Sequence, residues 1–272
     1  VLAPFRGSKY LQSRIGDSYR QAEQFLKEGR LVLFTGTPCQ IKGLVHYLGR
    51  TYENLTTVDV VCHGVPSPMV WQRYLTTLRA GQGEITGISF RNKSLSGWRR
   101  YDFVAQSTGG GGVRQFYGDN IYMRGFLHDL YLRPSCYACM AKGGRSQSDL
   151  TLGDYWGVER TCPDLDRALD EDKGTSVVMI HSERGRSLLE GLPCRYQETN
   201  YASALAGNPA IEHTAAEPPK RQLFFAQLDA EPLDSLIARL TATPLHKRLW
   251  RQLHHLAHRV KMRLRRLTQR SH

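Results

Sequence analysis

The chain has 272 residues, of which 40% are hydrophobic, so it can bury one large core or two smaller ones. No apolar run approaches the roughly 20 residues that a helix needs to cross a bilayer, and no secretory leader pattern opens the sequence, so we expect a cytoplasmic protein. The formal net charge of +12 is uneven, because nine of the 37 Lys and Arg residues, and no Asp or Glu, lie from residue 245 onward.

Two strand–turn–helix units follow one another near the start. A capping-box pattern at residues 18–21 predicts a first helix. The apolar run 31–34 predicts a strand that is buried on both faces, and residues 58–61 predict a second strand. Each strand is followed by a turn and by a helix with proline at its first position, Pro38 or Pro68. Repeated units of this kind predict parallel strands with crossover helices.

The middle of the chain changes to shorter alternating segments, and residues 84–90, 100–106 and 113–117 predict an antiparallel insertion. A helix over 120–130 and a loop over 132–148 are expected next. The fold class that we predict is α/β: a mixed sheet with parallel strand–turn–helix units, an antiparallel insertion and a helical C-terminal part. The last strands expected are 149–154 and 176–181.

Four of the six cysteines lie in turns. Cys39 and Cys62 follow the two predicted parallel strands at helix starts, where the helix dipole favours thiolate, and Cys136 and Cys139 form a C-x2-C pair. Six cysteines are too few for a disulfide scaffold, so this clustering indicates metal binding or catalysis. Four thiolates suit a [4Fe-4S] cluster, and they suit a zinc ion equally well. The remaining cysteines, Cys162 and Cys194, are expected to be structural.

Groups that can bind a phosphate or another polar part of a ligand occur in two places. The turn of Thr35, Gly36 and Thr37 precedes a helix, so its backbone N–H groups are predicted to bind phosphate. No G-x-G-x-x-G motif is present. Near the start of the chain a hydroxyl, a cation, an aromatic ring and an amide are close together, in Ser8, Lys9, Tyr10, Gln12 and Ser13. A Lys-Tyr pair by itself is more often part of the surface.

Three further polar positions have candidate roles. His63, next to a predicted ligand, is the catalytic candidate, placed to donate a hydrogen bond to a cluster or to a flavin. The alternative is a turn histidine that the backbone satisfies. Asp154 is predicted to be a buried carboxylate held by backbone donors, and residues 91–93 are predicted to be an exposed polar hairpin.

Leucines recur at near-heptad spacing among basic residues in 244–272, which predicts a basic amphipathic helix. Such a helix can lie on an anionic membrane surface as a peripheral contact, pack on a partner, or dock on its own domain. No motif indicates sequence-specific binding of nucleic acid.

The motifs around the cysteines resemble the beta subunit family of coenzyme F-420 hydrogenases and dehydrogenases. The matching segments, in chain order, are 7–13, 33–44, 58–68, 89–98 and 133–157. The resemblance implies an iron–sulfur flavoprotein oxidoreductase that holds FAD beside a [4Fe-4S] cluster. With it, Ser8, Lys9, Tyr10, Gln12 and Ser13 are predicted to bind the flavin, together with Thr35, Gly36 and Thr37. The resemblance also implies electron exchange with a small or deazaflavin-type acceptor or donor.

Family members commonly carry an N-terminal ferredoxin-like segment, and no cysteine precedes Cys39 here, so a second cluster would come from further sequence or from a ferredoxin-like partner. The alternative is a zinc-stabilised or cofactor-free member with a non-redox role linked to polysaccharide biosynthesis. We expect a flavin and iron–sulfur domain over 1–181, its helical completion over 182–243 and the basic tail over 244–272.

Overall fold

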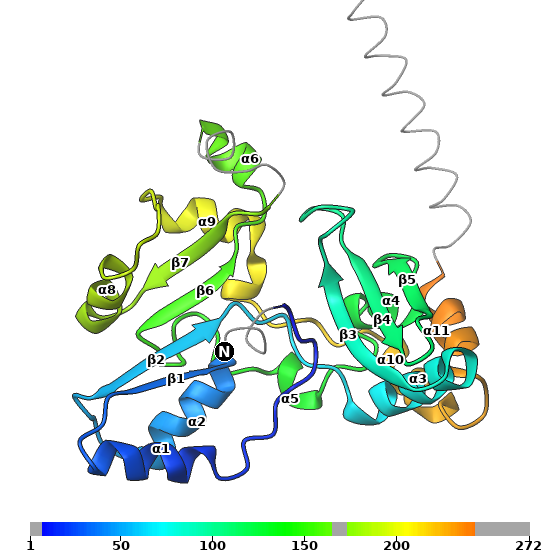
Figure 1. The fold of residues 1–272 in the computed structure, drawn as a ribbon, viewed down its shortest axis with the longest axis horizontal. Coiled ribbons are helices and arrows are strands. Elements are labelled where there is room, and N and C mark those ends of the chain that lie inside the picture. Colours follow the sequence, from blue (N-terminus) through cyan, green and yellow to red (C-terminus); the bar gives the residue numbers. More distant parts are fainter. Residues whose placement is uncertain (1–6, 165–172, 243–272) are drawn as a thin grey trace, which may run out of the picture.

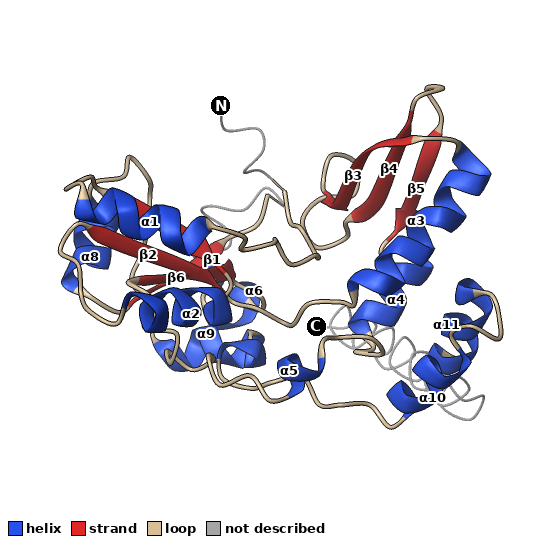
Figure 2. Cartoon of the chain, turned by 90° about the horizontal axis from the view of Figure 1, so that it is seen from below, coloured by secondary structure: helices blue, strands red, loops and turns tan. Residues whose placement is uncertain are grey.

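The computed structural model describes residues 7–164 and 173–242, which fold into two lobes (Figure 1). The four-stranded lobe holds the sheet β1-β2-β6-β7, and the three-stranded lobe holds the sheet β3-β4-β5. Figure 2 shows the two sheets at opposite ends of the molecule, with α5 between the lobes. The predicted basic tail, 244–272, lies outside the described residues.

The four-stranded lobe confirms the predicted mixed sheet. Strands β1 and β2 are parallel, β2 and β6 are parallel, and β6 and β7 are antiparallel. Helices surround this sheet in Figure 1. The elements of this lobe are α1 (Ser18–Lys27), β1 (Val32–Gly36), α2 (Pro38–Leu48), β2 (Leu55–Val60), β6 (Leu150–Asp154), α6 (Val158–Thr161), β7 (Ser176–Ile180), α8 (Glu183–Glu190), α9 (Tyr201–Gly207) and the 3-10 helix η2 (Pro209–Ile211).

The first strand–turn–helix unit forms because local signals agree. Thr37 caps α2 in a capping box with Gln40, and Pro38 takes the first helical position, where its missing N–H costs no hydrogen bond. The apolar face of α2 then packs with α1 and β2 in one core, through Leu44 and Leu26 among others. This packing fixes the turn after β1 at the carboxyl edge of the sheet.

The opposite face of the sheet is partly open, so the prediction of two-sided burial for β1 is wrong. Leu33 is 59% exposed, and Val60 and Leu152 on the neighbouring strands are 44% and 38% exposed. The pattern alternates along β1, with inward side chains on α1 and α2 and outward ones in solvent. A run of apolar letters cannot distinguish this arrangement from a strand covered on both sides.

The three-stranded lobe contains the predicted antiparallel insertion, which forms a sheet of its own. The C-terminal helices α10 and α11 pack in its core together with α4. Its elements are α3 (Pro68–Gln82), β3 (Ile85–Asn92), β4 (Asp102–Ser107), β5 (Gly112–Phe116), α4 (Ile121–Leu127), α10 (Lys220–Gln227) and α11 (Leu233–Thr241).

Aromatic rings fill the core of the three-stranded lobe. Tyr74 of α3 stacks on Tyr122 of α4, with ring centroids 5.1 Å apart. The buried Asn120 caps α4 through its carbonyl oxygen and donates from its amide to the Tyr74 hydroxyl at 2.7 Å. This contact satisfies the hydroxyl of Tyr74, because a buried polar group without a partner destabilises a core.

No helix within the described ranges is both long enough and apolar enough to span a bilayer.

Candidate functional site

The first two cysteines lie at the carboxyl edge of the four-stranded sheet. Cys39 is in the first turn of α2, directly after β1, and its sulfur is 3.2 Å from the Thr37 hydroxyl. Cys62 follows β2, two residues after its end. Because β1 and β2 are parallel neighbours, both cysteines are placed at one edge, where open α/β sheets form ligand crevices.

The C-x2-C loop meets the Cys62 turn. Cys136 lies in the short helix α5 (Pro134–Tyr137), and its sulfur accepts a hydrogen bond from the Val65 N–H at 3.4 Å. The Arg133 N–H donates to the Val65 carbonyl at 2.9 Å, which ties the same two loops together through the backbone. The predicted loop therefore brings Cys136 to the turn that contains Cys62.

Gly64 allows this close approach. A β-carbon at Gly64 would lie 2.8 Å from Cδ1 of Leu132 and 3.4 Å from the β-carbon of Cys136. Its φ of +153° is also a conformation that side chains other than glycine rarely adopt. Leu132 is fully buried, so it has little room to move away.

We expect Gly64→Ala to separate the two loops. The overpacking should lower the free energy of unfolding by about 1–3 kcal/mol, measured by urea denaturation. Gly109→Ala is the matched control, because a β-carbon there meets nothing within 4 Å. Equal stability of the two variants would contradict the close packing of the loops.

The four thiols influence one another electrostatically. Burial raises the pKa of the Cys62 thiol to about 12. The other three thiols add to this rise, and Lys142 opposes it. Burial also raises the pKa of the Cys136 thiol, the Val65 N–H lowers it, and the thiols of Cys39 and Cys139 raise it further. Such effects decay with distance, so the four cysteines share one region.

The four-cysteine set consists of Cys39, Cys62, Cys136 and Cys139. Within the described residues, no three His, Cys, Asp or Glu side chains are close enough together to hold one metal ion. A cubane cluster makes a smaller demand on closeness, since each of its four irons takes one cysteine. The donor chemistry of the four cysteines fits a cluster, whereas the ligands of a single zinc ion must approach one another more closely.

His63 is held by a residue that sequence reasoning missed. Its Nε2 is 2.6 Å from Oδ1 of Asp129, and its ring meets Phe126 edge-on with centroids 5.4 Å apart. Asp129 has a φ of +59°, uncommon for a residue with a β-carbon. Its carbonyl accepts from the hydroxyl of Tyr137, which follows Cys136. With Nε2 engaged, Nδ1 is the ring nitrogen left for a ligand.

The N-terminal segment with the predicted flavin-binding residues runs between the lobes (Figure 1). Tyr10 packs on Phe90 and Phe126 of the three-stranded lobe, with centroids 5.8 and 5.0 Å away. The Ser13 hydroxyl accepts from the Gln40 amide of α2 at 3.1 Å. The segment thus contacts both lobes; Ser8 and Gln12 are half-buried, and Lys9 is exposed.

The second predicted flavin-binding stretch is partly engaged within the protein. The Thr37 N–H donates to Oε1 of Gln40 at 2.9 Å, as part of the capping box. Thr35 is exposed and Gly36 is half-buried. The Thr37 donor is therefore taken by its own helix, whereas the rest of this turn lies open beside Cys39.

A buried ion pair joins the lobes. Arg91 at the end of β3 pairs with Asp154 at the end of β6, and Trp98 donates its indole N–H to the same carboxylate at 3.0 Å. Trp98 also stacks on Trp156, with centroids 4.4 Å apart. Arg91 is only 8% exposed, so the prediction of an exposed hairpin is wrong for this residue. Asp154 is held by side-chain donors rather than the predicted backbone donors.

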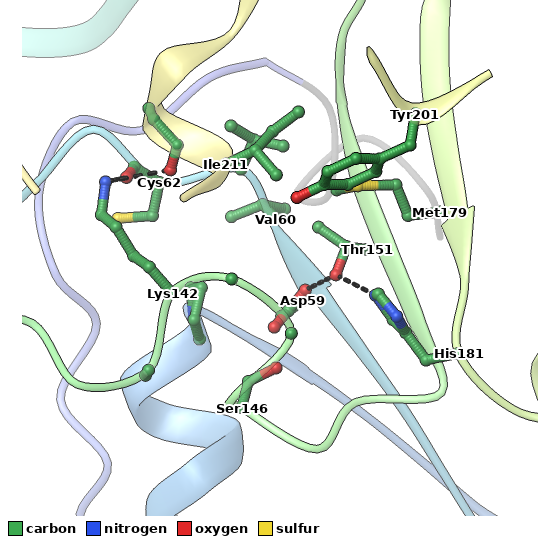
Figure 3. Close-up of a pocket in the computed structure, with 16 residues that line it drawn as sticks. Asp59, Val60, Cys62, Lys142, Ser146, Thr151, Met179, His181, Tyr201 and Ile211 are labelled. Atoms are coloured by element: carbon green, nitrogen blue, oxygen red, sulfur yellow. Dashed lines mark hydrogen bonds between the residues drawn. The ribbon is translucent and has the colours of Figure 1, made fainter. Parts of the chain in front are cut away.

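A pocket of about 270 Å³ opens beside Cys62 (Figure 3). Asp59, 1% exposed, accepts a hydrogen bond from the Thr151 hydroxyl. That hydroxyl has one proton, so Nε2 of His181, 2.9 Å away, must be the donor to it. Asp59 is a charged residue within the otherwise apolar run 58–61, and this is the feature of the sequence that could have identified it as a site residue.

Lys142 closes the side of this pocket nearest Cys62 (Figure 3). Its amine donates to the Cys62 carbonyl at 2.7 Å and to the Ala210 carbonyl at 3.0 Å. No spacing rule in the sequence distinguishes this lysine from exposed ones, so sequence reasoning missed it.

The fold and the site together define a class of protein: an α/β protein in which cysteines from separate turns gather at the carboxyl edge of a parallel strand pair, facing a second lobe. Comparison of the sequence with models of protein families identifies the family. The model that matches describes the C terminus of the beta subunit of coenzyme F420 hydrogenase/dehydrogenase, and it covers residues 29–201, well over half of the chain. The chain belongs to this family, which confirms the resemblance of its motifs and relates it to oxidoreductase subunits.

Among solved structures, the chain is similar to one in the F420-reducing [NiFe] hydrogenase complex of Methanosarcina barkeri, studied by xenon derivatization. The identity is 16% and the TM-score 0.39, over 86% of this chain and 65% of that one. The chain thus spans just under two thirds of the length of that hydrogenase chain. No curated protein matches it significantly.

Proposed function

We propose that this protein is an iron–sulfur flavoprotein oxidoreductase. It passes electrons between a [4Fe-4S] cluster and FAD, and exchanges them with a small or deazaflavin-type molecule, as the coenzyme F420 of the family description suggests. The observation that carries the proposal is the gathering of four cysteines from three separate segments at one sheet edge. A cluster requires this arrangement, and the three segments have no local reason to meet.

The four cysteines, Cys39, Cys62, Cys136 and Cys139, would hold the cluster. The Val65 N–H already donates to the Cys136 sulfur, and hydrogen bonds to ligand sulfurs are one way in which proteins set cluster potentials. When bound, a flavin accepts electrons in pairs and an iron–sulfur cluster transfers them singly. The protein's own task is to fix the positions of the groups and to exclude water.

The proposed flavin site lies between the lobes beside the four-cysteine set. The half-buried Tyr10, packed on the buried Phe126, offers an aromatic ring there, and His63 is aligned against Phe126 by Asp129. Its Nδ1 is proposed to hydrogen-bond a bound cofactor, with Asp129 as the positioning residue. Ser8, Lys9, Gln12 and Ser13 remain proposed polar contacts, as do Thr35, Gly36 and the side chain of Thr37.

A partner protein is part of the proposal. The family description is of a beta subunit, which implies work alongside other subunits. A ferredoxin-like partner fits best, because the described four-cysteine set accounts for one cluster and electrons must reach it from elsewhere. The basic segment 244–272 is proposed to make such a contact or a peripheral membrane contact.

Purification without oxygen tests the proposal directly. We expect coloured protein with about four irons and four sulfides per chain, a broad visible band bleached by dithionite, and a flavin that thin-layer chromatography identifies as FAD. Colourless protein with one zinc would contradict the proposal and select the zinc-stabilised alternative. Colourless, metal-free protein would contradict both.

A further inference from the structure

A buried lysine lies directly behind the four-cysteine set. Lys142 is the third residue after Cys139, and it is 5% exposed. Lysine is almost never this buried unless a partner compensates its charge. The position of this side chain therefore requires a physical explanation.

Two carbonyls fix the amine in place. The Cys62 carbonyl lies at 2.7 Å and the Ala210 carbonyl, in η2, at 3.0 Å. These contacts hold the charge at the end of β2, on the pocket side of Cys62 (Figure 3). The two carbonyls accept hydrogen bonds from the Lys142 amine, but they carry no net charge and so do not balance its positive charge.

No carboxylate within the described ranges is at ion-pair distance from the Lys142 amine. Burial lowers the pKa of the Lys142 ammonium group, and the thiols of Cys62, Cys139 and Cys136 and, last, the carboxylate of Asp129 oppose this by favouring the charged form. A buried cation without a counter-ion is strongly unfavourable. Thiolates of the four-cysteine set are the nearest source of the missing negative charge.

We infer that Lys142 is the counter-charge of the four-cysteine site, and that its ammonium group raises the reduction potential of the bound cluster. This inference rests on the proposed function. A cluster with four thiolate ligands becomes more negative when it takes up an electron, so a fixed positive charge beside it favours the reduced form. Within the protein interior this effect is screened far less than at the surface.

The chain contains a matched control for this charge. Lys42 of α2 also donates to a backbone carbonyl of the cysteine loop, that of Met140 at 3.2 Å. It differs from Lys142 in its exposure to solvent, since only the Lys142 side chain is buried. Both lysines thus carry the same charge beside the same loop, and water screens that of Lys42.

The test is a potentiometric titration of the cluster in the full chain, followed by electron paramagnetic resonance. Lys142→Met should lower the midpoint potential by at least the equivalent of a tenfold change in the one-electron equilibrium constant, about 59 mV. Lys142→Arg should keep the wild-type value to within a fraction of that shift, and Lys42→Met should too. An unchanged potential in Lys142→Met with full iron content would overturn the inference and leave the proposed function intact.

The adjoining pocket offers a second, independent test. Lys142→Ala should open a space continuous with the 270 Å³ pocket, which n-propylammonium can enter. The potential should return toward the wild-type value with n-propylammonium and should not change with n-propanol, which has similar size and no charge. Equal effects of the two compounds would overturn the inference.

Iron content separates the remaining outcomes. If wild-type protein prepared without oxygen holds no iron, the proposed function fails before the lysine is tested. If Lys142→Met assembles no cluster but Lys142→Arg does, the need for a positive charge is supported. If neither variant assembles one, the role of Lys142 is that of packing alone, and the inference is overturned.

Discussion

Cys62→Ser is expected to abolish the bound cluster. Cys62 lies in the turn after β2, where the Val65 N–H donates to the Cys136 sulfur. A serine hydroxyl is a poor iron ligand, and the three remaining thiolates come from two loops that Cys62 helps to join. Iron per chain should fall at least several-fold, and the signal of the reduced cluster in electron paramagnetic resonance should disappear.

Cys194→Ser is the matched control for this result. Cys194 is an exposed free thiol in the segment after α8, and nothing links it to the four-cysteine set. The iron content of the Cys194→Ser variant should equal that of the wild type. Both variants should retain their flavin if the cluster and the flavin have separate sites. Full iron content in Cys62→Ser, with an unchanged spectrum, would remove the main support for the proposed function.

The sequence predicts the strand–turn–helix units well because their signals are local. Pro38 and Pro68 mark helix starts, Thr37 and Gln40 complete a capping box, and the strands before them are short apolar runs. Parallel pairing of β1 and β2 follows from the repeated unit. Placing Cys39 and Cys62 at one edge needed nothing beyond these steps.

Contacts between the lobes could not be predicted in the same way. Arg91 and Asp154 are separated by 63 positions, and nothing in either segment indicates that the ends of β3 and β6 meet. A polar triplet after a strand is more often a solvated turn, which is why Arg91 was expected to be exposed. Asp129 and Lys142 were missed for the same reason, because their partners lie in distant turns.

The open face of β1 has a different cause. Leu33 is an apolar residue that suits a fully buried strand, yet it is 59% exposed, whereas Leu150 on the same face is buried where α8 packs near it. The hydrophobic pattern of a sequence indicates which residues can be buried. Which elements cover a given face of the sheet depends on segments that are far away along the chain. The four-stranded lobe is therefore predictable in topology and unpredictable in its layers.

The proposed site lies between two lobes, so its geometry depends on the few groups that join them. The Arg91–Asp154 pair is central among these, with Trp98 donating to the same carboxylate and Trp156 stacked beside it. The Arg91 guanidinium also lies over the Tyr101 ring, 4.6 Å from its centroid. A substitution of Arg91 or Asp154 should therefore lower the free energy of unfolding of the whole molecule by more than the loss of a contact within one sheet would.

Arg91→Met is accordingly expected to lower the free energy of unfolding by about 3 kcal/mol, the low end of the range for breaking a buried ion pair. The low end applies because the Asp154 side chain is 30% exposed, so water can partly solvate the carboxylate left behind. The measurement is urea denaturation followed by tryptophan fluorescence, which reports on Trp98 and Trp156 at the joint. Arg20→Met, which breaks an ion pair whose Arg side chain is 71% exposed, should change stability by less than about 1 kcal/mol.

A double-mutant cycle isolates the pair from the packing of the arginine stem. Asp154→Asn alone leaves the buried Arg91 guanidinium without a counter-ion and should also destabilise the protein. The double variant Arg91→Met with Asp154→Asn should lose less stability than the sum of the two single changes, because no unpaired charge remains. Strict additivity would show that the two side chains do not interact. The lobes would then have to be joined by the tryptophan stack and the backbone links between the cysteine loops.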